Sequence, residues 1–281
     1  MNFYNNKKWL YIIVFAIFVI YSLTLILPFV WLINNSFKTA EDFFFNVWGV
    51  PKRFFGTNYA DGFTVTVNGY NLFGMILNSV FVCVVGVLVS MFFNLCASYI
   101  FARFNFFGRK LIYALAITLM IVPTVGSTSA LYLFMMRTNL YDTYLGLFVL
   151  QANPFTFNFL LLYACFIGIS KSYEEAAEIE GASAWTIFVR IMIPQAAPVL
   201  LSLSIIQFIG IWNDFYTPYM FLPSKLTLAV GLDILNSKMT YDNNYPMLFA
   251  IMVISVIPVL ILFVLFQRTI MENTVAGGLK G

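Results

Sequence analysis

Six apolar stretches constrain this chain more than any other feature, because each is long enough to cross a bilayer as a helix. A transmembrane helix needs about 20 apolar residues, and a helix satisfies its own backbone polar groups in lipid. Only 10% of the residues are charged and 61% are hydrophobic, whereas a soluble domain carries about 25% charged residues. We therefore predict an all-α polytopic membrane protein with about six transmembrane helices, at residues 10–33, 75–100, 111–136, 144–169, 196–222 and 247–266.

The charges flanking these stretches predict an orientation. Lys7 and Lys8 precede the first stretch, which is longer than the apolar core of a signal peptide and is expected to stay uncleaved. Of the fifteen Lys and Arg residues, nine fall on the side of both termini and six on the other side. The positive-inside rule then places both termini in the cytoplasm. We predict one transmembrane domain over residues 1–281 in the cell membrane.

Several residue types that carry chemistry are missing or scattered. The sequence has no histidine, which excludes Ser-His and Cys-His catalysis and histidine ligation of a metal. Cys83, Cys96 and Cys165 all lie in apolar stretches, which argues against a disulfide framework or a metal site. There is no P-loop and no basic tract. We therefore expect no enzyme activity, no cofactor or metal in this chain, and no nucleic-acid partner.

Two segments on the outer side are long. Residues 35–74 contain Pro51, several glycines and many aromatic residues. They are consistent either with a short helix or cap or with a plain connecting loop, and the sequence leaves both readings open. Residues 224–246 form the second such segment and are rich in Asn, Asp and Tyr.

Residues 170–194, between the fourth and fifth stretches, are predicted to form two short helices joined by a turn. Ser172 and Glu175 have the spacing of a capping box at the start of the first helix. Ala176 and Ala177 favour a helix with little bulk. Gly181 can take the left-handed conformation that ends a helix.

The second short helix is predicted to carry an apolar stripe. Trp185, Phe188, Ile191 and Met192 recur at helical spacing. Pro194 is expected to end or kink this helix before the fifth span. The two helices together would form a rigid projection on the cytoplasmic surface, able to transmit a push from a soluble partner.

The same segment resembles the EAA loop of importer-type ABC permeases. That pattern is E-A-A-x3-G-x9-I-x-L-P, and the one departure here is Ile193 in place of Leu. The resemblance implies an ATPase-coupling role within the cytoplasmic loop 171–195 for Glu175, Ala176, Ala177, Gly181, Ala182, Ile191 and Pro194.

More of the chain, about residues 72–281, resembles the maltose-type carbohydrate importers. Ala102-Arg103 with Gly108-Arg109 is similar to the A-R-x-x-F-x-G-R segment of that branch, and residues 210–215 are similar to its G-x-W-N-D-F segment. The ending at residues 277–281 resembles G-x-x-K-G. The resemblance implies that Gly278, Lys280 and Gly281 can reach the ATPase pair.

What the resemblance implies is a permease subunit of an ATP-driven, binding-protein-dependent importer for a sugar, most simply an oligosaccharide, that works by alternating access. Its partners would be a second, different permease, two copies of an ABC ATPase, an extracytoplasmic solute-binding protein and the lipid bilayer. ATP and Mg would be used only by the ATPase. A permease for a polyol or a glycerol phosphate is the alternative within this class. A secondary transporter fits less well, because those proteins commonly carry inverted repeats and several intramembrane charges.

Asp214 is the one ionisable residue predicted well inside a span, which makes it a functional candidate. With Trp212, Asn213 and Tyr216 it offers aromatic faces and polar groups suited to a sugar. A structural role, holding a neighbouring span or a gate, is equally compatible with the sequence. These four residues are the candidate substrate pathway.

The remaining polar residues have simpler predicted roles. Glu174 and Glu180 are expected to be solvated rather than paired with the ATPase. Asn78 and Asn94 are expected to form hydrogen bonds between helices. Pro123 is expected to kink the third span.

Overall fold

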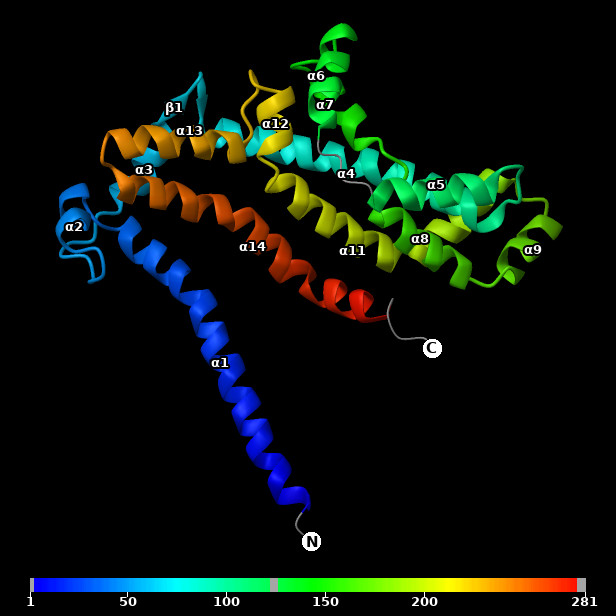
Figure 1. Ribbon diagram of the computed structural model, residues 1–281, viewed down its shortest axis with the longest axis horizontal. Coiled ribbons are helices and arrows are strands. Elements are labelled where there is room, and N and C mark those ends of the chain that lie inside the picture. Colours follow the sequence, from blue (N-terminus) through cyan, green and yellow to red (C-terminus); the bar gives the residue numbers. More distant parts are fainter. Residues whose placement is uncertain (1–2, 122–125, 277–281) are drawn as a thin grey trace. The chain divides into compact units, whose positions relative to one another are not determined.

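The computed structural model describes residues 3–121 and 126–276, with side chains for 8–121 and 126–268. The described chain is helical apart from turns and one two-stranded hairpin, so the predicted all-α fold is confirmed (Figure 1). Contacts divide it into two units. One comprises Met1–Phe73 with Gly231–Ile257, and the other comprises Gly74–Val230 with Pro258–Gly281. Each unit is described by itself.

Within the described residues, four helices are long and apolar enough to cross a membrane. They cover Lys8–Ser36, Leu72–Arg103, Ala184–Trp212 and Tyr245–Arg268. The other two predicted spans are interrupted. Gly126 has a left-handed φ of 90° before α6 (Ser127–Arg137), and residues 152–156, which include Pro154, separate α7 (Tyr144–Gln151) from α8 (Phe157–Gly168). Proline interrupts a helix because it lacks an N–H donor and restricts the preceding residue. Pro123 lies outside the described residues.

The first unit combines a long helix with a folded cap. It contains α1 (Phe3–Ser36), α2 (Ala40–Phe45), α3 (Thr57–Thr64) and the antiparallel strands β1 (Thr66–Val67) and β2 (Tyr70–Asn71). The hairpin turns at Asn68 and Gly69, which both have positive φ, as a two-residue turn of this twist requires. Parts of α13 (Leu228–Tyr241) and α14 (Tyr245–Ala276) belong to this unit.

Of the two readings of residues 35–74, the folded one is confirmed. Lys38 is fully buried, and its Nζ donates to the carbonyl oxygens of Asn46 and Val47. Asn58 donates to the carbonyl oxygens of Ser36 and Lys38, at 2.7 and 2.8 Å. Burial lowers the pKa of Lys38, partly offset by nearby Asp42. These bonds satisfy backbone groups that a plain loop would leave to water.

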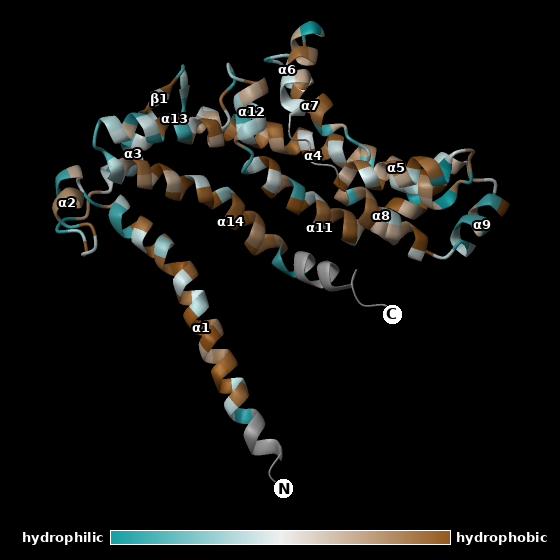
Figure 2. Ribbon diagram, viewed as in Figure 1, coloured by the Kyte–Doolittle hydropathy of each residue, from teal (hydrophilic) through white to brown (hydrophobic). Residues whose placement is uncertain are grey.

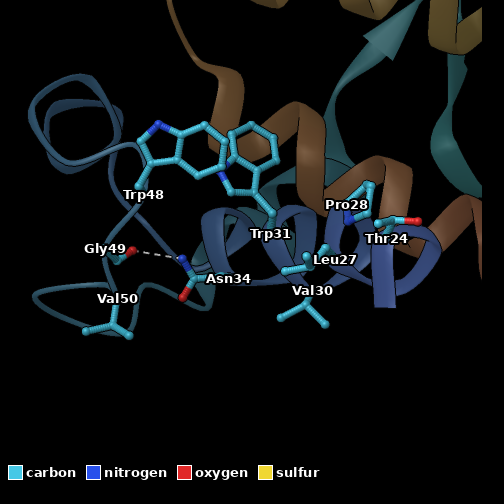
Figure 3. A pocket seen from close by; sticks show the side chains of 9 residues that line it. All are labelled: Thr24, Leu27, Pro28, Val30, Trp31, Asn34, Trp48, Gly49 and Val50. Carbon is cyan, nitrogen blue, oxygen red and sulfur yellow. Dashed lines mark hydrogen bonds between the residues drawn. The ribbon is translucent and has the colours of Figure 1, made fainter. Parts of the chain in front are cut away.

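An apolar groove of about 650 Å³ lies beside this cap (Figure 3). The rings of Trp31 and Trp48 lie 5.9 Å apart along it, and Asn34 donates to the carbonyl oxygen of Gly49 at 2.9 Å. Its other lining residues come from the last turns of α1 and from Val50.

The second unit holds most of α4 (Leu72–Arg103), then α5 (Arg109–Ile121), α6, α7 and α8. After these come α9 (Ser172–Ile179), α10 (Ala184–Ile187), the π-helical turn η1 (Phe188–Met192), α11 (Ile193–Trp212) and α12 (Tyr216–Phe221). The ribbon is mainly apolar along α8 and α11 and mainly polar at α9 (Figure 2). A short polar helix at the end of apolar ones is the arrangement expected of a helix that leaves the membrane.

Asparagines in α4 form the predicted hydrogen bonds to other segments. Asn78 donates to the carbonyl oxygens of Lys225 and Leu226, both at 2.9 Å, and accepts from the Tyr144 hydroxyl at 2.7 Å. Asn94 donates to the carbonyl oxygen of Asn153 at 3.2 Å and accepts from the Thr156 hydroxyl at 2.7 Å. The expected bond between helices is confirmed for Asn78, whose partner Tyr144 begins α7, whereas Asn94 bonds to the break between α7 and α8.

Candidate functional site

The site consists of residues 170–194, which we call the coupling segment, and the parts of α4, α8 and α11 that hold it. Its first helix, α9, ends in a Schellman motif. Gly181 has a φ of 82°, its N–H donates to the carbonyl oxygen of Glu178 at 3.0 Å, and the Ala182 N–H donates to that of Ala177 at 2.9 Å. These two bonds satisfy the last carbonyls of the helix. The prediction for Gly181 is confirmed.

The start of α9 differs from the prediction. Ser172 already lies inside the helix, and the Ser170 hydroxyl oxygen accepts its N–H at 3.3 Å. The capping box of Ser172 and Glu175 is therefore wrong. The helix begins one residue too early for it, so the Ser172 side chain instead hydrogen-bonds the Ser170 hydroxyl at 2.8 Å.

A buried ion pair fastens α9 to α4. The Arg103 Nε lies 2.9 Å from Glu174 Oε1, and the two side chains are only 5% and 16% exposed. Arg103 Nη2 also donates to the carbonyl oxygen of Ile169, at the end of α8, at 2.7 Å. One guanidinium thus connects α4, α8 and α9. The expectation that Glu174 is solvated is wrong, whereas Glu180 is exposed as predicted.

Sequence reasoning missed the role of Arg103. The signal was present in Ala102-Arg103 at the end of α4, but nothing in the sequence pairs Arg103 with one particular glutamate of the coupling segment. Burial raises the pKa of the Glu174 carboxyl, and the positive charge of Arg103 acts in the opposite direction. The two residues meet only because α8 brings the chain back beside the end of α4.

Helix α9 presents different residues inward and outward. Ala177 is 7% exposed and belongs to the core of the second unit. Tyr173, Ala176 and Ile179 are exposed and recur every three residues, so they lie on one face. Ile179 is 88% exposed, which is unusual for an aliphatic residue outside the membrane spans. Of the predicted coupling residues, Glu175 and Ala176 are exposed while Ala177 is buried.

The second half of the coupling segment is continuous with α11. Ser183 caps α10, because its hydroxyl accepts the Thr186 N–H at 3.2 Å. The Ile193 N–H donates to the carbonyl oxygen of Phe188, the i to i−5 bond of a π turn. Pro194 follows at the start of α11. Of the predicted end or kink at Pro194, the end is wrong, because the helix continues from Ala184 to Trp212 and the missing proline N–H lies next to a π turn.

The apolar stripe of this half is partly as predicted. Phe188 and Met192 are buried and Ile191 packs against the same core, but Trp185 is 63% exposed. Ile187, at 2% exposure, takes the inward place that was predicted for Trp185. The stripe packs on a cluster that draws on α4, α8, α9 and α11, and its members are Met91, Leu95, Tyr99, Leu162, Phe166, Ala177, Ile187, Phe188, Met192, Ala196 and Leu203.

The candidate substrate-pathway residues lie at the other end of α11. Asp214 is not inside a helix: it falls in the break between α11 and α12, half-exposed, and its Oδ1 accepts the Thr217 N–H at 3.0 Å. Trp212 is buried and stacks on Phe208, and Asn213 donates to the carbonyl oxygen of Ile209 at 2.8 Å. The expectation of an acid well inside a span is therefore wrong.

These four side chains do not converge on one another. Tyr216 is 54% exposed, and its hydroxyl lies 3.5 Å from that of Thr128, where it can donate a hydrogen bond. Asn213 and Asp214 bond to their own segment, and Trp212 points into the core. Their role in a substrate pathway stays a prediction. The tail residues Gly278, Lys280 and Gly281 lie outside the described residues.

Acidic and thiol groups are too dispersed to hold a metal in the described part of the chain. No group of three or more His, Cys, Asp or Glu side chains gathers there. The described fold is that of a polytopic helical membrane protein whose last long spans follow an exposed, rigidly mounted helix. That combination defines a polytopic helical membrane protein with one exposed helix, α9, between its long apolar helices.

The family follows from comparison with known proteins. The chain belongs to the family of the binding-protein-dependent transport system inner membrane component, whose model matches residues 86–274. The coupling segment lies within this match. The chain is therefore the membrane component of a transport system that works with a binding protein, and it is a translocation subunit rather than a catalytic one.

Two relatives in this family are named for the sugars they handle. The chain is 32% identical over 267 residues to the diacetylchitobiose uptake system permease protein NgcG of Streptomyces coelicolor, covering 93% of this chain and 86% of that protein. It is 33% identical over 208 residues to the arabinooligosaccharides transport system permease protein AraQ of Halalkalibacterium halodurans, covering 73% of each.

A solved structure shares the fold. It is the crystal structure of a bacterial ABC transporter involved in the import of the acidic polysaccharide alginate. One chain of it matches with a TM-score of 0.80 at 23% identity, covering 95% of this chain and 99% of that chain. The likeness supports the arrangement of helices described above.

Proposed function

We propose that this chain is the permease subunit of an ATP-driven importer for an oligosaccharide and that it receives its driving force through α9. The observation that carries the proposal is the construction of α9. Its outer face exposes Tyr173, Ala176 and Ile179, while its inner side is fixed by Ala177 and by the ion pair of Glu174 with Arg103. A helix that offers an apolar face at this spacing is suited to a groove in a partner.

The rigid mounting explains how such a helix does mechanical work. A displaced helix moves the membrane spans only if the connection between them does not bend. The Schellman turn, the core beneath Phe188 and the continuity of α10, η1 and α11 provide that connection. An ATPase that moves α9 would therefore also move α11. Glu175, Gly181, Ala182, Ile191 and Pro194 act in this proposal as parts of the docking surface or of its support.

The solute assignment is supported by the relatives named for diacetylchitobiose and arabinooligosaccharides. The related alginate transporter has also been solved in complex with a pentasaccharide-bound periplasmic protein. The partners in this proposal are a second permease, two ATPase copies that use ATP and Mg, and an extracytoplasmic binding protein that delivers the sugar. Both termini lie in the cytoplasm, and Gly278, Lys280 and Gly281 contact the ATPase.

The test uses Gly181→Asp in the complete transporter. A side chain at a φ of 82° strains the turn, and the added charge stands beside the docking face. Gly168→Asp is the matched control, because Gly168 also has open space around it but no left-handed backbone. Gly181→Asp is expected to lose ATPase co-purification and oligosaccharide uptake, while Gly168→Asp retains both. Wild-type co-purification and uptake in Gly181→Asp would sink the coupling role.

A further inference from the structure

The connection between α4 and α5 forms a second feature that the coupling role does not use. A pocket of about 770 Å³ lies between residues 105–108, the first turns of α5 and Tyr163 of α8. Phe106, Phe107 and Tyr113 supply its apolar walls, and Arg109 and Lys110 supply its charge. Two adjacent cations in an aromatic pocket favour an anion that also has apolar parts.

The cation at Arg109 is held in place. Its Nη1 donates to Asn105 Oδ1 at 2.7 Å, and its Nη2 lies 3.5 Å from the Tyr163 hydroxyl. The two ion pairs within the described residues join Arg103 to Glu174 and Lys225 to Asp142. Arg109 and Lys110 therefore face no carboxylate there. They also begin the 13-residue helix α5, whose N-terminal dipole adds to the attraction for an anion.

The apolar part of the ligand is indicated by the outer face of α5. Leu111, Leu115 and Leu119 are 65%, 52% and 70% exposed and recur every four residues, so they form one stripe that begins at the pocket. Phe107, at its rim, is fully exposed. An aliphatic stripe that continues from a cationic pocket at the end of a predicted span matches a lipid whose head group is anionic and whose chain runs along the helix.

We propose that this pocket binds an anionic phospholipid, with the phosphate at Arg109 and Lys110 and an acyl chain along Leu111, Leu115 and Leu119. The site lies in the leaflet on the side of the coupling segment, which is the cytoplasmic one in the proposed orientation. A soluble partner fits less well, because the stripe extends along the third predicted span. The proposal concerns lipid binding and does not depend on which solute is transported.

The test measures lipid binding to the complete, detergent-purified transporter by native mass spectrometry. Phosphatidylglycerol is titrated, with phosphatidylcholine as the neutral lipid and glycerol 3-phosphate as the soluble phosphate. Lys110→Gln is expected to weaken phosphatidylglycerol binding about fivefold, and Arg109→Gln with Lys110→Gln about thirtyfold, from the attraction of each cation near an anionic surface. The double variant Arg137→Gln with Lys238→Gln removes the same charge from exposed positions elsewhere and is expected to bind as wild type.

The outcomes separate the possible ligands. Loss of phosphatidylglycerol binding in the pocket variants only, with no competition from glycerol 3-phosphate, supports the lipid site. Equal binding by the pocket and control variants overturns it. Displacement of the lipid by glycerol 3-phosphate at a similar concentration also overturns it, in favour of a soluble phosphate. Lys110→Gln removes one charge and leaves the hydrogen bonds of Arg109 intact. If the double variant fails to fold, phosphatidylglycerol binding by Lys110→Gln alone therefore still decides the proposal.

Discussion

The two ends of α11 are held in different ways. At its first residues the helix continues backward through η1 and α10 into a core shared with α4, α8 and α9, and Phe188 and Met192 are buried there. At its last residues the chain breaks at Asn213 and Asp214. Among the described residues, Asn213 bonds to its own helix and Asp214 to the first turn of the next one.

This difference predicts that the two ends of α11 differ in stiffness. The first end is fastened by contacts between segments far apart in the sequence, so it can transfer a movement of α9 without bending. The second end is fixed by local hydrogen bonds and exposes Asn213 and Tyr216. Local bonds leave a segment freer to open than a shared core does. In the proposed coupling role, the end of α11 that α9 would drive is therefore the stiffer end, and the end that we assign to the solute is the more adaptable one.

Removal of the charge at Arg103 is expected to disturb the first end most. Arg103→Met leaves Glu174 buried without a partner, at a cost of about 3 kcal/mol. The melting temperature of the assembled transporter and the amount of co-purified ATPase should both fall. Arg137→Met, at an exposed arginine of α6, serves as the control and should change neither.

The double variant Arg103→Met with Glu174→Met sharpens this prediction. Replacing both members of a buried pair by apolar residues is often close to neutral. The double variant should thus recover most of the melting temperature lost in Arg103→Met. Additive losses would show that the ion pair is not what holds α9.

Two aromatic residues of the coupling segment provide the next test. Phe188→Ala opens a cavity in the shared core and is expected to cost about 3 kcal/mol. Trp185→Ala removes a larger but 63% exposed side chain from the same segment, and should cost less than about 1 kcal/mol. Thermal denaturation of the two complexes measures the contrast, and equal shifts would contradict a rigid first end.

Substitutions at Gly181 test the left-handed conformation of the turn after α9. Gly181→Val is expected to cost about 1–2 kcal/mol, because a β-branched residue is strained in the left-handed region. Gly181→Asn should cost less, since asparagine tolerates that conformation. ATPase stimulation by the loaded binding protein is the readout, with uncoupling expected to be stronger for Val than for Asn. A reversed order would mean that the backbone conformation is not what matters.

Substitutions at Asp214 test the role of the break after the last residues of α11. Asparagine retains the oxygen that accepts the Thr217 N–H, so Asp214→Asn should assemble normally. Asp214→Ala loses that bond at a cost of about 1 kcal/mol. If Asp214 faces the solute, uptake falls in Asp214→Asn although assembly does not. Unchanged uptake kinetics in this variant would assign Asp214 to the structural role alone.

The smallest expected effect is a pH dependence at the first end. Burial raises the pKa of Glu174 above its ordinary value of 4.5, against the smaller opposing effect of Arg103. Between these two pKa values, Glu174 is protonated in the folded protein and ionised in the unfolded chain. The stability that protonated Glu174 contributes is therefore full below pH 4.5 and is lost as the pH rises through the raised pKa. Melting temperatures should decline less over this range in Glu174→Gln than in wild type. Parallel curves would contradict the shift, and exposed Glu180→Gln is the control.

Much of the site could be predicted from local sequence. Gly181 ends α9 because a left-handed residue is needed one position past the C-cap Glu180, and glycine has no steric strain in that conformation. Asn78 and Asn94 cross-link segments because a polar amide in an apolar helix needs a partner. The predicted capping box is absent because the helix begins one residue too early for it, and the Ser170 hydroxyl, two residues before Ser172, accepts the Ser172 N–H instead. The predicted inward position of Trp185 is wrong because the π turn that follows changes which side of the helix faces the core.

The sequence by itself determined the class of this protein. Long apolar stretches and few charges require a helical membrane protein, and the spacing of residues 175–194 predicts the coupling segment, because these properties depend on composition and on neighbours along the chain. Only the tertiary structure decided that Arg103 holds Glu174 and that Arg109 and Lys110 share a pocket with Tyr163. Those contacts join residues distant in sequence, and their partners are set by how helices pack rather than by any local pattern.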